Sequence, residues 1–183
     1  MDRQVETEKG GNYMWLWIGL GILVLILIIA FISMQKNKAG VSSYQEVVNQ
    51  NQISTRFIST LTGNQESPIV ITNAQGNATV LFTQDGRVAY RVEFNNLGSP
   101  YKSAHFHVGP PGIAGPIVKD ISNNFISTNS NRTSGIIEGT WSVTDDQPFD
   151  RQNLVDLLAG RLYFNVHSQV YPDGEIRGQI LSR

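Results

Sequence analysis

Residues 162–181 of the chain read LYFNVHSQVYPDGEIRGQIL, and this stretch decides the fold. Apolar and polar side chains alternate on both sides of the sequence PDG at 172–174, as they do in strands that bury one face. Proline presets the backbone for a turn, and glycine accepts a positive φ. The stretch therefore predicts an antiparallel pair of strands, with Leu162, Phe164 and Val166 on the apolar face of the first.

The same pattern extends over residues 53–183. Runs with β-branched and aromatic residues alternate there with clusters of Gly, Asn, Asp and Pro. Many short strands separated by turn signals are typical of an antiparallel sandwich or barrel. Asp85-Gly86 lies between two alternating runs and predicts a tight hairpin. One short helix is expected between Asp150, a typical N-cap residue, and Gly160, which can end it.

All three histidines of the chain fall in strand-like runs. His105 and His107 are two residues apart, so their side chains point to one face of their strand. His167 lies opposite the apolar face of its run, and Glu175 and Arg177 take the same side of the following run. If these strands are neighbours, one face of the sheet gathers all five side chains.

Two interpretations of this cluster are open. Three imidazoles, two of them on one strand, suit a tetrahedral zinc ion or a copper ion. In this interpretation His105, His107 and His167 are the metal ligands. Glu175 and Arg177 do not bind the ion but orient the imidazole rings. In the other interpretation the imidazoles form a structural network with Glu175, backbone groups and water.

Composition and motifs exclude several other functions. The chain has no cysteine, which excludes a disulfide scaffold, a Cys-ligated zinc site and a thiol nucleophile. A net charge of −1 argues against a nucleic-acid partner, because such domains carry a basic excess. Ser168 lacks an elbow motif and faces away from His167, and Asp145-Asp146 is interpreted as a turn. We therefore expect no catalytic residues and no enzyme activity.

Residues 14–34 form an uncharged, strongly apolar stretch, MWLWIGLGILVLILIIAFISM. As a helix it would cover about 30 Å, the thickness of a bilayer's hydrocarbon core. Trp15 and Trp17 near one edge and Lys36 and Lys38 at the other are typical of membrane interfaces. The predicted organisation is a polar tail (1–13), a transmembrane helix (14–34), a linker (35–52) and the β domain (53–183).

The orientation of this anchor depends on weaker signals. Basic residues flank the apolar stretch equally, so the positive-inside rule does not orient it. A short tail before the helix and a folded domain after it favour a single-pass signal anchor with the C-terminal domain outside the cytoplasm. In a eukaryotic secretory route, the sequons at Asn77 and Asn131 would then be glycosylation sites.

Several stretches together resemble the chordin-type (CHRD) domain. They are LTGNQESP, TNAQGNATVLF, DGRVAYRVEFNNL, AHFHVGPPGIAGPIV, LLAGRLYFNVHS and YPDGEIRGQI, in this order between Arg56 and Leu181. The resemblance implies an immunoglobulin-like or superoxide-dismutase-like β-sandwich. It also implies that the family's histidines correspond to His105, His107 and His167. Chordin binds bone morphogenetic proteins outside the cell, but this chain lacks its Cys-rich modules, so growth-factor binding is not carried over.

These observations favour a membrane-anchored, non-enzymatic surface module whose partners are the bilayer and other proteins. The alternative is a metal-binding domain that holds zinc or copper and has a redox role. Three histidines without cysteine fall short of the ligand set and disulfide of Cu/Zn superoxide dismutases, so dismutation is not expected. A third alternative, suggested by a compact chain rich in Asn and Ile, is a membrane or capsid-associated protein in the virion of a large DNA virus.

Overall fold

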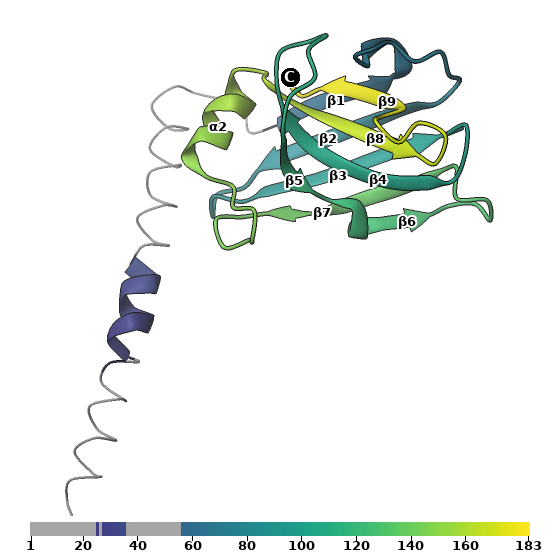
Figure 1. The fold of residues 1–183 in the computed structure, drawn as a ribbon. Coiled ribbons are helices and arrows are strands. Elements are labelled where there is room, and N and C mark those ends of the chain that lie inside the picture. Colours follow the sequence, from purple (N-terminus) through teal and green to yellow (C-terminus); the bar gives the residue numbers. More distant parts are fainter. Residues whose placement is uncertain (1–24, 26, 36–55) are drawn as a thin grey trace, which may run out of the picture. The chain divides into compact units, whose positions relative to one another are not determined.

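The structure is a computed structural model that describes Leu25, residues 27–35 and residues 56–183. The chain divides into two units, residues 1–38 and residues 39–183. The described residues of the first unit are α-helical (Figure 1), and their side chains are exposed. The second unit contains the β domain.

The described helical residues cover only part of the predicted membrane anchor. Within them and the rest of the described chain, no helix combines the length and the apolar character that a membrane crossing requires. Trp15, Trp17, Lys36 and Lys38, together with most of the linker, lie outside the described residues. The transmembrane anchor therefore stays a prediction.

Ten strands and one α-helix make up residues 56–183 (Figure 1). The strands are β1 (Arg56–Thr62), β2 (Gln75–Phe82), β3 (Val88–Asn95), β4 (Tyr101–Val108), β5 (Ile117–Asp120), β6 (Phe125–Ser127), β7 (Gly135–Trp141), β8 (Leu162–Ser168), β9 (Ile176–Gln179) and β10 (Leu181–Ser182). The helix α2 (Arg151–Leu158) lies between β7 and β8. Short 3-10 turns, η1 (Gly63–Gln65) and η2 (Ser122–Asn124), follow β1 and β5.

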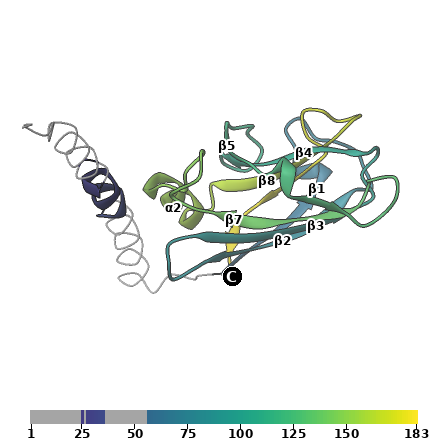
Figure 2. The ribbon, with the colours of Figure 1, turned by 90° about the horizontal axis from the view of Figure 1, so that it is seen from below.

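The strands form one continuous antiparallel sheet that folds over on itself. Their order is β5-β4-β8-β9-β1-β2-β3-β7-β6, and β10 pairs with β1. The two halves join where β9 meets β1, at the pair Thr62 and Arg177. Figure 2 shows β4, β5 and β8 in one layer and β2, β3 and β7 in the other. The predicted all-β antiparallel sandwich, in its half-barrel form and with one short helix, is confirmed for this domain.

Large aromatic side chains fill the space between the two layers. Phe106 on β4 lies fully buried, with its ring centroid 4.4 Å from that of Phe164 on β8 and 5.0 Å from that of Trp141 on β7. Aromatic rings bury a large area each and dominate the energetics of such a core. Because Phe106 points inward, the period of two places His105 and His107 on the other face of β4.

Local sequence signals set the turns and the helix where they were expected. Asp150 caps α2, since its side chain accepts a hydrogen bond from the backbone N–H of Asn153 at 2.8 Å. Gly160 follows the helix with a φ of +65° and Gly86 closes the β2–β3 hairpin with a φ of +78°. Glycine adopts these left-handed conformations without the steric cost of a Cβ atom.

Candidate metal centre

Strands β8 and β9 are buried on both of their faces. One face belongs to the core, and the other carries polar side chains from three neighbouring strands. We call this second set the polar layer; it consists of His105, His107, Tyr163, Asn165, His167, Arg177 and Gln179. An antiparallel sheet commonly turns its polar face to water. Here the polar face is itself covered, so each of its groups needs a partner inside the protein.

The three histidines meet within the polar layer. The Nδ1 atom of His105 lies 2.9 Å from the Nε2 atom of His167, and the ring of His107 is centred 5.6 Å from that of His105. One ring nitrogen from each residue lies within 4.8 Å of the other two. They come together because β4 and β8 pair directly, with His105 opposite Asn165 and Ser103 opposite His167.

Backbone carbonyls orient two of the three rings. The Nδ1 atom of His107 lies 2.8 Å from the carbonyl oxygen of Gly115, and that of His167 lies 3.0 Å from the carbonyl oxygen of Pro172. Because a carbonyl oxygen only accepts, each Nδ1 carries the proton and each Nε2 keeps its lone pair. Histidines that bind metals are usually held in this way by their second nitrogen.

Burial favours the neutral form of all three rings. Desolvation lowers the pKa of His105 and of His107, and it lowers the pKa of His167 to about 4. The neighbouring His105 ring contributes to the shift at His167, whereas Asp120 opposes the shift at His105. A metal ion binds the neutral imidazole, so the lowered pKa values favour the uncharged form that the ligands need at neutral pH.

The positions of the three nitrogens fit a transition-metal ion. The Nε2 atom of His107 is buried and has no hydrogen-bond partner among the described residues, which is a costly state for a polar atom. Tetrahedral coordination at about 2.0–2.1 Å requires nitrogen separations of about 3.4 Å. This value lies between the 2.9 Å that separates His105 from His167 and the 4.8 Å that bounds the whole set. Imidazole ligands suit zinc and copper alike.

Tyr163 lies between the histidines and a buried arginine. The guanidinium of Arg177 is 3.5 Å from the centre of the Tyr163 ring, and His107 stacks on that ring with centroids 4.9 Å apart. Because β8 lies between β4 and β9, the two residues approach the ring from opposite sides. Arg177 also donates hydrogen bonds to the carbonyls of Pro110 and Ile113, at 2.8 and 2.9 Å. It thereby fastens the loop after β4 over the polar layer.

Comparison with protein families identifies this β domain. The family model described as the CHRD domain matches residues 57–180. The chain belongs to the CHRD domain family. Membership confirms the resemblance of the sequence stretches and implies a binding role for this β-fold module.

Individual proteins add little to this family assignment. A comparison with curated proteins finds no match. Among solved structures, the crystal structure of the clock protein EA4 matches with a TM-score of 0.40 and 14% sequence identity. The match covers 71% of this chain and 96% of the EA4 chain.

Glu175 lies apart from the histidines of the CHRD domain. Its Oε1 atom accepts hydrogen bonds from the Thr72 hydroxyl at 2.6 Å and from the Gly98 N–H at 2.8 Å. The side chain is fully buried and ties these two loops together, with no hydrogen bond to an imidazole among the described residues. Gly174, with a φ of +132°, interrupts the strand alternation just before it. The expected support of the imidazoles by Glu175 is therefore absent, and Arg177 reaches His107 only through Tyr163.

Sequence reasoning missed Glu66, which the structure places against the polar layer of the CHRD domain. Its Oε2 atom accepts a hydrogen bond from the Asn165 side chain at 3.2 Å. Burial raises the pKa of Glu66 to about 7, although the Arg177 charge opposes this shift. Glu66 lies in the LTGNQESP stretch that resembles the CHRD domain, but it follows β1 in a segment without strand alternation, so no periodicity predicts its contact with Asn165.

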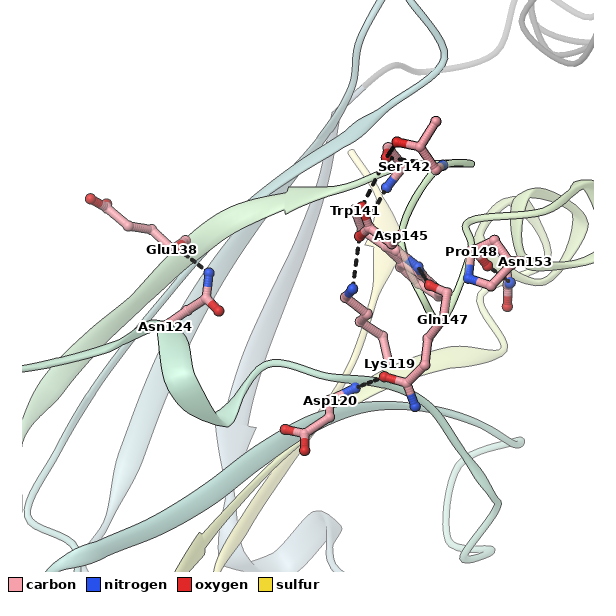
Figure 3. Close-up of polar contacts among 11 residues, drawn as sticks. Lys119, Asp120, Asn124, Glu138, Trp141, Ser142, Asp145, Gln147, Pro148 and Asn153 are labelled. Carbon is pink, nitrogen blue, oxygen red and sulfur yellow. Dashed lines mark hydrogen bonds and ion pairs between the residues drawn. The ribbon is translucent and has the colours of Figure 1, made fainter. Parts of the chain in front are cut away.

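Asp145 belongs to a structural network outside the polar layer (Figure 3). Its Oδ2 atom lies 2.7 Å from the Lys119 ammonium, and its Oδ1 atom accepts a hydrogen bond from the Ser142 hydroxyl at 2.9 Å. The Gln147 side chain accepts a hydrogen bond from the Asp120 N–H at 2.7 Å. These contacts fasten β5 to the loop that leads into α2, so Asp145 holds a turn, as the sequence indicated. They also position Asp120, which sequence reasoning did not single out.

Both sequons of the CHRD domain lie on its surface. Asn77 is exposed on β2, and Asn131 is exposed in the turn between β6 and β7. The Thr133 hydroxyl of the second sequon donates a hydrogen bond to the Asn131 side chain at 3.0 Å. Both side chains are accessible, and their glycosylation stays a prediction.

Proposed function

We propose that this CHRD domain is a non-enzymatic binding module that holds one zinc or copper ion among His105, His107 and His167. Two observations carry this proposal: the Nε2 atom of His107 is buried and unpartnered among the described residues, and one ring nitrogen from each of the three histidines lies within 4.8 Å of the other two. The ion would bind the lone pairs of the three ring nitrogens. It would thereby link β4, which carries His105 and His107, to β8, which carries His167. The chain's own contribution is the orientation of the rings by the carbonyls of Gly115 and Pro172.

Limited access supports a binding role rather than catalysis. A catalytic zinc site keeps an open position for water or substrate. The side chain of His105 is only 12% exposed, and His107 and His167 are buried beneath the surrounding loops. A substrate larger than water has little room to approach the three rings. A redox role for a copper ion at this position is the alternative form of the same proposal.

Metal analysis of the full-length protein in detergent tests this function. The chain has only three histidines, so a purification tag without histidine keeps the count unambiguous. We expect one equivalent of zinc or copper by mass spectrometry of the metal, bound more tightly than micromolar. His107→Ala should reduce binding at least tenfold, while Lys102→Ala, an exposed change on the same strand, should leave it unchanged. Absence of stoichiometric metal binding by the wild type would overturn the proposal.

A second proposed function is contact with a protein partner at the loops above the polar layer. Ile69, Ile71, Ile113 and Val170 are all more than half exposed there, at 69%, 94%, 59% and 63%. Ile69 lines one pocket together with Pro111 and Gly112 and a second pocket together with Ile71, and adjoining apolar side chains on a surface mark interaction sites. In this proposal the domain is displayed outside the cytoplasm by the predicted helix at 14–34, and the bilayer is its second partner. The virion setting stays a prediction.

Cross-linking in the native membrane tests this surface. A photo-reactive residue at position 71 should capture a partner protein in a discrete product, whereas the same residue at Asn77, exposed on β2, should not. The double change Ile69→Ser with Ile71→Ser should abolish any complex seen by native electrophoresis. Equal cross-linking at both positions would contradict a specific contact surface.

A further inference from the structure

His105 is held differently from the other two histidines. Its Nδ1 atom bonds to the Nε2 atom of His167 at 2.9 Å rather than to a backbone carbonyl. Its Nε2 atom faces Asp120, with 3.9 Å to the Oδ1 atom of that carboxylate. The two residues are direct cross-strand partners in the β4–β5 pair, so this proximity is a property of the strand register.

The hydrogen bonds fix the tautomer of His105 without a metal. His167 donates from Nδ1 to the carbonyl of Pro172, so its Nε2 atom accepts. The Nδ1 atom of His105 must then carry the proton of the 2.9 Å contact. Its Nε2 atom keeps a lone pair and has no proton to donate to Asp120. The 3.9 Å separation, too long for a hydrogen bond, agrees with that assignment.

A bound metal ion requires the opposite tautomer. The nitrogens of His105 and His167 that face each other would both need their lone pairs for the ion. The proton of His105 must therefore leave Nδ1, and an equivalent proton must be present on Nε2, which is the atom that faces Asp120. Exchange through solvent moves this proton with no net gain or loss, and the carboxylate oxygen can accept the new N–H.

We propose that Asp120 is a positioning residue that selects the metal-binding tautomer of His105; this inference rests on the proposed metal site. The carboxylate is itself held in place, because its Oδ1 atom accepts hydrogen bonds from the Ser122 N–H at 2.8 Å and from the Ser122 hydroxyl at 2.6 Å. Carboxylates that orient a ligating histidine contribute about 10–100-fold to metal affinity. Because the Asp120 side chain is 57% exposed, we expect its contribution to metal affinity to lie at the lower end of this range, about tenfold.

Metal competition on the full-length protein tests this role. Zinc affinity is measured against a chelator for the wild type, Asp120→Ala, Asp120→Asn and the control Asp146→Ala, which removes an exposed charge from a nearby loop. We expect about tenfold weaker binding for Asp120→Ala and wild-type binding for Asp146→Ala. Asp120→Asn retains an acceptor for the N–H and the Ser122 contacts, so it should recover part of the loss. It also controls for loosening of β5.

The tautomer is measured directly by nitrogen-15 NMR of the imidazoles. Metal-free protein should show His105 protonated at Nδ1, and zinc-loaded protein should show it protonated at Nε2. A wild type that binds no zinc overturns the metal site and this inference together. A wild type that binds zinc, with Asp120→Ala equal to Asp146→Ala or with an Nδ1 proton retained on His105, overturns the role of Asp120 and leaves the metal site standing.

Discussion

Replacing Glu66 with glutamine tests the buried acid–amide pair at the edge of the polar layer. The Asn165 amide donates to Oε2 of Glu66, while Oε1 of Glu66 and Oδ1 of Asn165 have no partner among the described residues. A protonated carboxyl carries one O–H donor. Neutral Glu66 can therefore donate to the Asn165 oxygen and close a ring of two hydrogen bonds. Ionised Glu66 has no O–H to donate, so its Oε1 atom and the Oδ1 atom of Asn165 stay without a hydrogen bond in the interior.

Proton linkage gives the sign and the size of the effect. Burial raises the pKa of Glu66 from 4.5 to about 7, so the folded protein holds this proton more tightly than the unfolded chain. The resulting stability is fully present below pH 4.5 and is lost as the pH rises through about 7. One pKa unit corresponds to about 1.4 kcal/mol, so the whole difference is worth about 3 kcal/mol of unfolding free energy.

Urea unfolding of residues 39–183 measures this difference, because Trp141 is the single tryptophan of that unit and reports on the core. Glu66→Gln cannot ionise, so it should match the wild type at about pH 4.5 and exceed it by up to about 3 kcal/mol at about pH 8. Glu93→Gln, exposed on β3, is the matched control and should keep the wild-type dependence on pH. If Glu66→Gln and the wild type lose stability equally between those two pH values, the reasoning is refuted.

Three further changes test other parts of the domain. Arg177→Lys removes the two-pronged contact with the Pro110–Ile113 turn and should lower the unfolding free energy by about 2–3 kcal/mol in the same urea assay; an unchanged midpoint would contradict this. Gly115→Ala would place a Cβ atom 1.8 Å from the Val108 carbonyl oxygen and should cost more than about 3 kcal/mol, against about 1 kcal/mol for Gly112→Ala, where only the positive φ opposes the change. Asn131→Gln should remove one glycan, seen as a shift in gel mobility, when the chain passes through a eukaryotic secretory route.

The sequence predicts the strands of this domain, and the faces on which their side chains lie, better than it predicts the loops that cover the polar layer. The period of two placed His105, His107 and His167 on one face, because Phe106 and the apolar residues of β8 had to point inward. That period says nothing about the loops above this face, so neither the burial of the polar layer nor the contact with Glu66 could be foreseen. Glu175 was misplaced for a local reason, since the alternation of the following strand was extended back to it, whereas β9 begins only at Ile176.

The unpartnered atoms of the polar layer separate the metal site from a purely structural network. A proton on Glu66 pairs its own Oε1 atom with Asn165, but no such change helps His107. Moving the proton of His107 to Nε2 would set the Nδ1 lone pair against the Gly115 carbonyl oxygen, 2.8 Å away. A structural network of protein groups alone therefore leaves a deficit of about 1–3 kcal/mol, which either a bound ion or a water molecule that donates to Nε2 removes.

Metal should accordingly stabilise the fold. At a free zinc concentration one hundred times the dissociation constant, the unfolding free energy of the wild type should rise by about 2.7 kcal/mol. His107→Ala lacks one of the three ligands and should show at most a small fraction of that gain. In a structural network the urea midpoints of both proteins would be independent of zinc, so the difference between the two midpoints decides between the interpretations.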